Sequence, residues 1–201
     1  TFANMFNGCF ELKELDISEF DTESALTMEG MFYDCRAIET LNLEGFYTPN
    51  VTTMAGMFYG CELLTELYMP NLVTNNVNSM KEMFRGCRAL TQLDLSNFDT
   101  SRTINMEGMF RDCRSLTELN LENFNTFIVL NMNSMFLNCS AIKTLDLMSF
   151  RTDMVTDMGS MFLGCTKLEH LNVNNFVTED VRDMSSMFYD CNSLTYLFLD
   201  S

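Results

Sequence analysis

The sequence predicts an α/β solenoid: one elongated domain, residues 1–201, made of eight stacked turns, the first and last incomplete. Three observations predict it. A repeat of 26 residues runs through the chain, two apolar periodicities alternate inside each repeat, and residues that favour bends separate them. Repeat arrays grow around one continuous core. We therefore expect each turn to add one short parallel strand and one short helical segment, in a right-handed coil.

The pair Met-Phe marks the repeat, and a cysteine follows four residues after each methionine. The pairs begin, without one insertion, at Met5, Met31, Met57, Met83, Met109, Met135, Met161 and Met187. The cysteines are Cys9, Cys35, Cys61, Cys87, Cys113, Cys139, Cys165 and Cys191. Equivalent side chains of successive turns stack in a solenoid, so we expect the cysteines to form a structural ladder.

The strand is predicted around a Leu-x-Leu motif, as in Leu93 and Leu95. Its period of two suits a short strand with one buried face. The helical segment is predicted from Val51 to Cys61, because apolar residues there fall at steps typical of a helical or 3₁₀ segment. Neither element can bury its apolar face alone, so stacked turns would enclose leucine, methionine, phenylalanine and cysteine.

Two further patterns mark the bends of each turn. Phenylalanine recurs after the strand, as in Phe98 and Phe124, and is expected to form a stacked aromatic spine. Threonine follows two residues later, and its hydroxyl is expected to bond a nearby backbone group. Before each cysteine, glycine alternates with aspartate or asparagine, as in Gly60 and Asp34, which predicts a left-handed backbone there.

The segments "LSNFDT" (residues 95–100) and "MEGMFRDC" (residues 106–113) are similar to the BspA-type leucine-rich repeats, in a variant abundant in mycoplasma surface lipoproteins and other bacterial surface proteins. The resemblance covers the whole chain. It implies a leucine-rich-repeat-like fold, a secreted or cell-surface location and a role in adhesion, with no catalytic residues to carry over. The chain departs from the family pattern at residues 101–104 and 127–130, around the usual valine.

The formal net charge of −16 argues against a nucleic-acid partner, because phosphate binding needs clustered lysine and arginine. A basic protein, a polycation or calcium fits better, although acidity also serves solubility alone. No apolar run approaches the roughly 18 residues that cross a bilayer. We therefore expect membrane attachment only through an anchor outside this segment.

The cysteines allow three interpretations: buried free thiols, sporadic disulfides, or a site for a soft metal. Neighbouring cysteines would lie one turn apart, with Cβ atoms separated by about 4.8 Å, whereas a disulfide needs roughly 3.5 to 4.5 Å. We favour free thiols that pack as small hydrophobic groups, and we expect no metal and no other cofactor.

We also expect a protein that is not an enzyme. The only histidine, His170, cannot by itself support acid–base chemistry, and no nucleophile triad, paired carboxylates or phosphate-binding loop recurs. The favoured function is binding or adhesion to a protein or glycan, with host or matrix molecules as candidates. The alternative is a structural spacer or a fibre-forming solenoid.

The exposed face of the predicted strands is the first candidate binding surface. It carries carboxylates and apolar anchors but no lysine or arginine, so it would attract a cationic partner. A merely solvated sheet face is the alternative. The candidate partner-binding residues are Glu14, Asp16, Glu66, Tyr68, Asp94, Glu118, Asn120, Asp146, Met148, His170, Tyr196 and Phe198.

A second candidate is a basic patch at matching positions of adjacent turns, made of Arg85, Arg88, Arg111 and Arg114. Stacked guanidinium groups would bind carboxylates, sulfated glycan or the acidic face of a neighbouring copy; a salt-bridged surface is the alternative. The sequence shows no polar cap at either end, although terminal turns normally need one. We expect either a segment of a longer surface protein or copies that associate head to tail.

Overall fold

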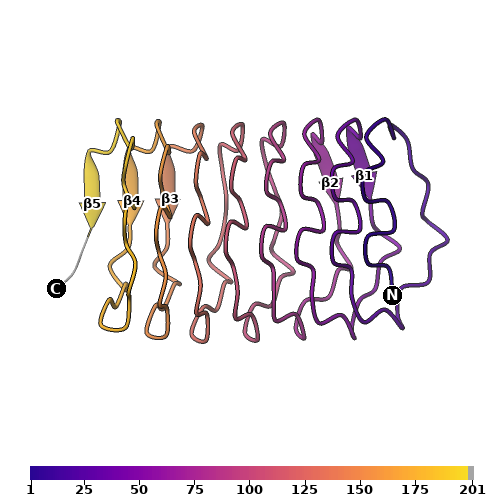
Figure 1. Ribbon diagram of the computed structural model, residues 1–201, viewed down its shortest axis with the longest axis horizontal. Coiled ribbons are helices and arrows are strands. Elements are labelled where there is room, and N and C mark those ends of the chain that lie inside the picture. Colours follow the sequence, from indigo (N-terminus) through magenta and orange to yellow (C-terminus); the bar gives the residue numbers. More distant parts are fainter. Residues whose placement is uncertain (199–201) are drawn as a thin grey trace.

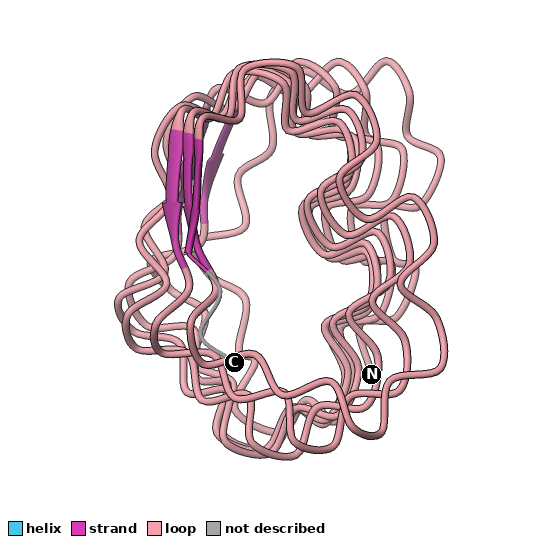
Figure 2. Ribbon diagram, turned by 90° about the vertical axis from the view of Figure 1, so that its left-hand side faces the viewer, coloured by secondary structure: helices cyan, strands magenta, loops and turns pink. Residues whose placement is uncertain are grey.

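The computed structural model describes residues 1–198 and confirms a solenoid. Figure 1 shows the turns stacked along one axis, and Figure 2 shows each turn as a closed loop with the strands on one wall. The strands are β1 (Thr40–Asn42), β2 (Glu66–Tyr68), β3 (Thr144–Asp146), β4 (His170–Asn172) and β5 (Tyr196–Phe198). β1 pairs with β2, and β3, β4 and β5 form a second sheet, with every pair parallel. We call the side that carries these strands the strand wall.

The predicted helical segments are wrong: residues 1–198 contain no helix, and each turn instead makes consecutive tight turns opposite the strands. The cause lies in the backbone around each Met-Phe pair. The residue before the methionine and the third residue after it both have positive φ, as at Gly56 (59°) and Gly60 (70°). A left-handed residue at every fourth position stops a right-handed helix. The prediction of left-handed bends before the cysteines is confirmed, for instance at Asp34 (57°).

We call this second side the Met-Phe wall. Its backbone bonds alternately within one turn and to the next turn. The N–H of Cys35 donates to the carbonyl of Phe32 at 3.1 Å, whereas the N–H of Phe32 donates to the carbonyl of Met57 in the next turn at 2.9 Å. Equivalent bonds recur along the chain, for example from Phe84 to Met109 at 2.9 Å. The Met-Phe wall is therefore one continuous hydrogen-bonded ladder.

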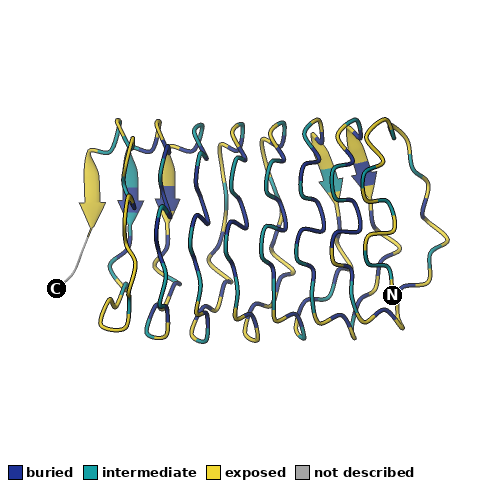
Figure 3. Ribbon diagram, in the orientation of Figure 1, coloured by how far each residue is buried: buried dark blue, intermediate teal, exposed yellow. Residues whose placement is uncertain are grey.

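The core between the two walls consists of stacked columns. The phenylalanines of the Met-Phe pairs form one continuous stack from Phe6 to Phe188, with neighbouring ring centroids 5.5 to 5.8 Å apart. The expected spine after the strand is limited to Phe124 and Phe150, whose centroids are 6.3 Å apart; Leu72 is one interruption of that column. Figure 3 shows that burial is deepest in the middle turns.

Buried threonines tie each turn to the next. The hydroxyl of Thr100 donates to the carbonyl of Asn125 at 3.0 Å and accepts the N–H of the same residue at 2.8 Å. The same reciprocal bonds are made by Thr22, Thr48, Thr74, Thr126 and Thr152. The predicted hydroxyl-to-backbone bond is confirmed, with its partner in the next turn rather than in the bend itself.

The sheet is interrupted between β2 and β3, although a strand was expected in every turn. Residues 92–94 and 118–120 form no strand, and their backbone groups make no hydrogen bond to other backbone groups. The residues beside the central leucines account for the difference. Gln92, Asp94, Glu118 and Asn120 flank the unpaired leucines, and aspartate, asparagine and glutamate are depleted in strands. β1, β2, β3 and β5 each carry a threonine, tyrosine or phenylalanine beside the leucine. β4 carries histidine and asparagine there, but it pairs with such a strand on each side.

The structure also bears on membrane insertion. Within residues 1–198 there is no helix long and apolar enough to cross a bilayer.

Replacing Thr100 by valine should destabilise the solenoid, because both backbone groups of Asn125 lose their partner in a part-buried position. We expect a cost of about 1–3 kcal/mol, which corresponds to a fall in Tm of roughly 2–4 °C per kcal/mol for a chain of this size. The control is Thr144→Val, because Thr144 is exposed in β3. Thermal melts followed by circular dichroism that gave both variants the same Tm would contradict the threonine column as a stabilising element.

Candidate functional site

The strand wall presents the apolar residues that were predicted to contact a partner. The side chains of Tyr68, Met148, Tyr196 and Phe198 are 54%, 45%, 56% and 50% exposed. His170 is half-buried, and its ring stacks on Tyr196 with centroids 4.9 Å apart. These side chains lie at separate places along the wall, so they do not form one cluster.

Two grooves cross the strand wall where the sheet is interrupted. The first groove, of about 480 Å³, lies between β2 and the extended segments 92–94 and 118–120. The second groove, of about 600 Å³, lies between segment 118–120 and β3. Six of the twelve predicted partner-binding residues line these grooves: Glu66, Tyr68, Asp94, Glu118, Asn120 and Asp146. The interruption of the sheet therefore brings half of the predicted residues together.

The other six predicted residues lie outside the two grooves. Met148 follows β3, and His170, Tyr196 and Phe198 belong to the paired strands β4 and β5. Glu14 and Asp16 belong to the first turn, which forms no strand. The carboxylate of Asp16 accepts hydrogen bonds from the hydroxyl and the N–H of Ser18, which lower the pKa of Asp16.

The first groove is acidic. Glu66, Asp94 and Glu118 line it, and none of its lining residues within the described chain is a lysine or arginine. The carboxylate of Asp94 accepts the N–H of Ser96 at 2.9 Å, and hydrogen bonds from Ser96 lower the pKa of Asp94. Asp94 therefore stays ionised at neutral pH. The second groove adds one base, Lys143, whose ammonium lies 3.9 Å from a carboxylate oxygen of Glu169.

The floor of the grooves is apolar. Leu67, Leu93 and Leu119 are only partly buried, whereas the equivalent Leu145 and Leu171 of the paired strands are 1% and 0% exposed. Leu145 is buried although β3 also borders the interruption, so the partly exposed leucines are those of β2 and of the two unpaired segments. The grooves therefore combine carboxylates at the rim with exposed hydrocarbon below. Sequence reasoning missed them, since nothing in the repeat itself distinguishes these turns; the poor strand formers beside Leu93 and Leu119 were the available signal.

The basic patch is salt-bridged. Its ion pairs are Arg85 with Glu82, Arg88 with Glu62 at 3.4 Å, and Arg111 and Arg114 with Asp112 at 3.7 and 2.9 Å. The guanidinium of Arg85 also lies over the ring of Tyr59, 4.9 Å from its centroid. Each arginine thus has a carboxylate partner, and the patch matches the salt-bridged alternative more closely than an open anion site.

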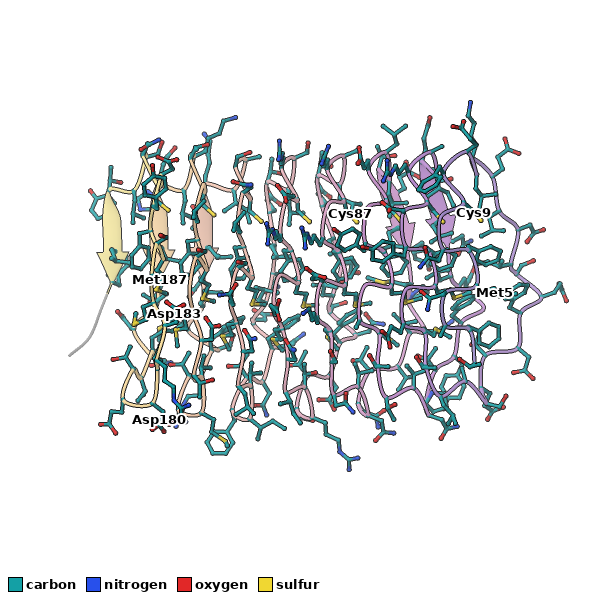
Figure 4. The ribbon with its side chains drawn as sticks, in the orientation of Figure 1. Met5, Cys9, Cys87, Asp180, Asp183 and Met187 are labelled. Carbon is teal, nitrogen blue, oxygen red and sulfur yellow. The ribbon has the colours of Figure 1, made fainter. Side chains whose placement is uncertain are left out.

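The cysteines lie in one column along the Met-Phe wall. Within residues 1–198 all eight are free thiols; Cys9 is exposed, Cys191 is partly buried and the other six are buried. Figure 4 shows Cys9 and Cys87 at the same height in the view but at different positions along the horizontal solenoid axis. The thiol of Cys87 donates to the carbonyl of Phe58 in the preceding turn at 3.2 Å. Burial raises the pKa of Cys113 to about 12, so the thiol remains protonated at neutral pH.

The geometry offers no metal centre. Within the described residues, no group of three histidine, cysteine, aspartate or glutamate side chains is placed to hold a metal ion.

Three overlapping stretches of the chain, residues 1–92, 37–147 and 117–197, match the family described as "Mycoplasma protein of unknown function, DUF285". The chain belongs to this family. The assignment agrees with the resemblance carried by the repeat motifs. None of the curated proteins compared with this DUF285 chain is significantly similar to it.

A solved structure confirms the leucine-rich-repeat fold of the DUF285 chain. A leucine-rich repeat protein of T. pallidum is 20% identical, with a TM-score of 0.51 over 82% of this chain and 69% of that one. A leucine-rich repeat protein from Bacteroides ovatus is 19% identical, with a TM-score of 0.42 over 96% of this chain and 56% of that one. The chain thus spans little more than half of the B. ovatus protein.

The thiol column predicts selective reactivity in the native DUF285 protein. We expect Ellman's reagent at pH 8 to modify Cys9 promptly and the six buried thiols only after unfolding, because burial blocks access and raises their pKa. The control is Cys9→Ser, which should lose the prompt reaction. Fast modification of several thiols in that variant would contradict a buried column.

The same column predicts a loss of stability in alkali. The folded-state pKa of Cys113 is raised to about 12, so its contribution is fully present below the unfolded-state pKa and is lost as the pH rises toward 12. Urea unfolding between pH 8 and 10 should show a steeper decline for the native sequence than for Cys113→Ala. The difference should approach about 1.4 kcal/mol per pH unit above the unfolded-state pKa of about 8.5. Identical slopes would show that this thiol does not titrate differently on folding.

Proposed function

We propose that this protein is a non-catalytic cell-surface module that binds a protein or glycan partner through its strand wall, in the manner of an adhesin. The observation that carries the proposal is the opening of the strand wall between β2 and β3. There, six of the predicted partner-binding residues line two adjoining grooves. The Met-Phe wall, in contrast, uses its backbone groups within the ladder.

The composition of the strand wall supports binding. Tyrosine is among the residues that dominate the energetics of protein interfaces, and Tyr68 and Tyr196 are both more than half exposed on this wall. Carboxylates around Tyr68 add long-range attraction for a partner of opposite charge, which mainly speeds association. Aromatic anchors and a one-sign field therefore occur together on one side of the molecule.

The arrangement favours binding over catalysis. General acid–base chemistry needs titratable groups that converge on one reacting atom. The only histidine of the chain, His170, stacks on Tyr196 and lines neither groove. The surface location rests on the resemblance of the repeats to bacterial surface proteins.

The proposal is tested by binding to intact host cells, immobilised matrix proteins and sulfated glycans. We expect saturable binding to one of them and a loss of affinity of at least about ten-fold when Tyr68, Tyr196 and Phe198 are all replaced by serine, because interface anchors commonly contribute more than 1 kcal/mol each. The control is Tyr189→Ser, since Tyr189 is 63% exposed but lies on the Met-Phe wall.

Circular dichroism melts of the variants check that the solenoid remains folded. Unchanged binding by the folded triple variant, or an equal loss in Tyr189→Ser, would overturn the assignment of binding to the strand wall.

A further inference from the structure

We infer that the two grooves bind an extended, lysine-bearing segment of a partner protein that runs along the solenoid axis. The inference rests on the proposed function, because it names the chemistry of a partner for the same wall. Four features of the grooves support it: unpaired backbone groups, charge, shape and spacing.

The unpaired segments beside the grooves have backbone groups without a backbone hydrogen-bond partner. In a parallel sheet the N–H and C=O groups point toward the neighbouring strands, which in this molecule is the direction of the solenoid axis. Segments 92–94 and 118–120 have no bonded neighbour, so these groups face the grooves. They include both donors and acceptors. A peptide that runs along the axis does not extend the sheet, but its lysine ammonium groups can donate to these carbonyls and its side-chain hydroxyl groups can accept from these N–H groups, whereas a simple cation would match the acceptors alone.

The carboxylates of the first groove favour a cationic segment. Glu66, Asp94 and Glu118 line the first groove without a compensating base, so an ammonium group that enters it gains attraction from several carboxylates. A sulfated glycan or an acidic peptide would be repelled there. The second groove continues this acidic surface through Glu118 and Asp146, with Lys143 held near Glu169.

Shape favours lysine over arginine. The partly exposed side chains of Leu67, Leu93 and Leu119 form an apolar floor on which the hydrocarbon stem of a lysine can lie. Its compact ammonium group has three donors, which suit carbonyl and carboxylate oxygens at different angles. The planar guanidinium group of arginine is instead suited to a bidentate carboxylate in a fixed plane.

Spacing favours an extended chain. The two grooves share Glu118 and Asn120, so they adjoin each other along the axis. Successive turns of such a sheet lie about 4.8 Å apart, and alternate residues of an extended peptide lie about 6.6–6.8 Å apart. The first groove is centred on segment 92–94 and the second lies between segment 118–120 and β3, so their centres are one and a half turns, or about 7 Å, apart. Lysines at alternate positions therefore fit the two grooves, with the residues between them facing solvent.

The test uses the full chain and a labelled short peptide in which lysine and threonine alternate, measured by fluorescence anisotropy. Gln92→Lys places a competing ammonium group in the first groove, and we expect it to weaken binding by about ten-fold or more. The matched control is Asn78→Lys, which makes the same change of charge at an exposed amide half a turn away. Its effect should stay within about three-fold.

A second pair of variants introduces a negative charge at the same two positions. Gln92→Glu should tighten binding, and Asn78→Glu should change it little. Equal effects at the two positions would overturn the inference, because they would show attraction by net charge alone. Equal affinity for the corresponding arginine peptide, or for a peptide with its lysines adjacent in sequence, would overturn the specificity for spaced lysines. If Gln92→Lys fails to fold, the comparison of Gln92→Glu with Asn78→Glu tests the inference instead.

The outcome also separates this inference from the proposed function. If the lysine peptide does not bind while the serine variants of Tyr68, Tyr196 and Phe198 still lose a cell or matrix ligand, the grooves do not accept lysine but the strand wall remains the binding surface. Preferential binding of heparin to the strand wall would likewise overturn the inference that the grooves bind a cationic segment.

Discussion

The ladder of the Met-Phe wall is the constraint on which the rest of the structure depends. The N–H of each phenylalanine in this ladder donates to a methionine carbonyl of the next turn, as in Phe32 to Met57 at 2.9 Å. These bonds fix both the spacing and the alignment of successive turns. The columns of phenylalanine, cysteine and methionine follow from that alignment, because equivalent side chains have no freedom to shift along the axis. Buried polar backbone groups also need their partners, which makes a slip of one turn against another costly.

The strand wall has more freedom because the turns are already held together elsewhere. Its sheet is absent in the two adjacent turns where neither residue beside the central leucine favours a strand, namely Gln92 and Asp94 in one and Glu118 and Asn120 in the next. The loss of pairing costs little free energy at the surface, because water can form hydrogen bonds with the exposed backbone groups. It also creates the grooves. The Met-Phe wall thus provides the stability, and the strand wall can vary in a way that suits recognition.

The sequence was sufficient for the period, the column of cysteines and the position of the left-handed bends. It was misleading about the helical segment, because apolar steps of three and four also arise in consecutive tight turns such as those around Gly56 and Gly60. The aromatic spine was assigned to the phenylalanine after the strand, whereas the continuous stack is formed by the phenylalanine of each Met-Phe pair. The grooves depend on which individual turns pair, and this is decided by small differences at Gln92 and Glu118 rather than by the repeat.

The directionality of the ladder has a consequence for how such chains change in length. Each unit offers the same donors to the unit after it and the same acceptors to the unit before it. Duplication or deletion of one whole unit by recombination therefore restores an equivalent junction, whereas gain or loss of a single residue misaligns the Met-Phe wall at that point. The length of the solenoid can vary in steps of one unit while the interior chemistry stays the same.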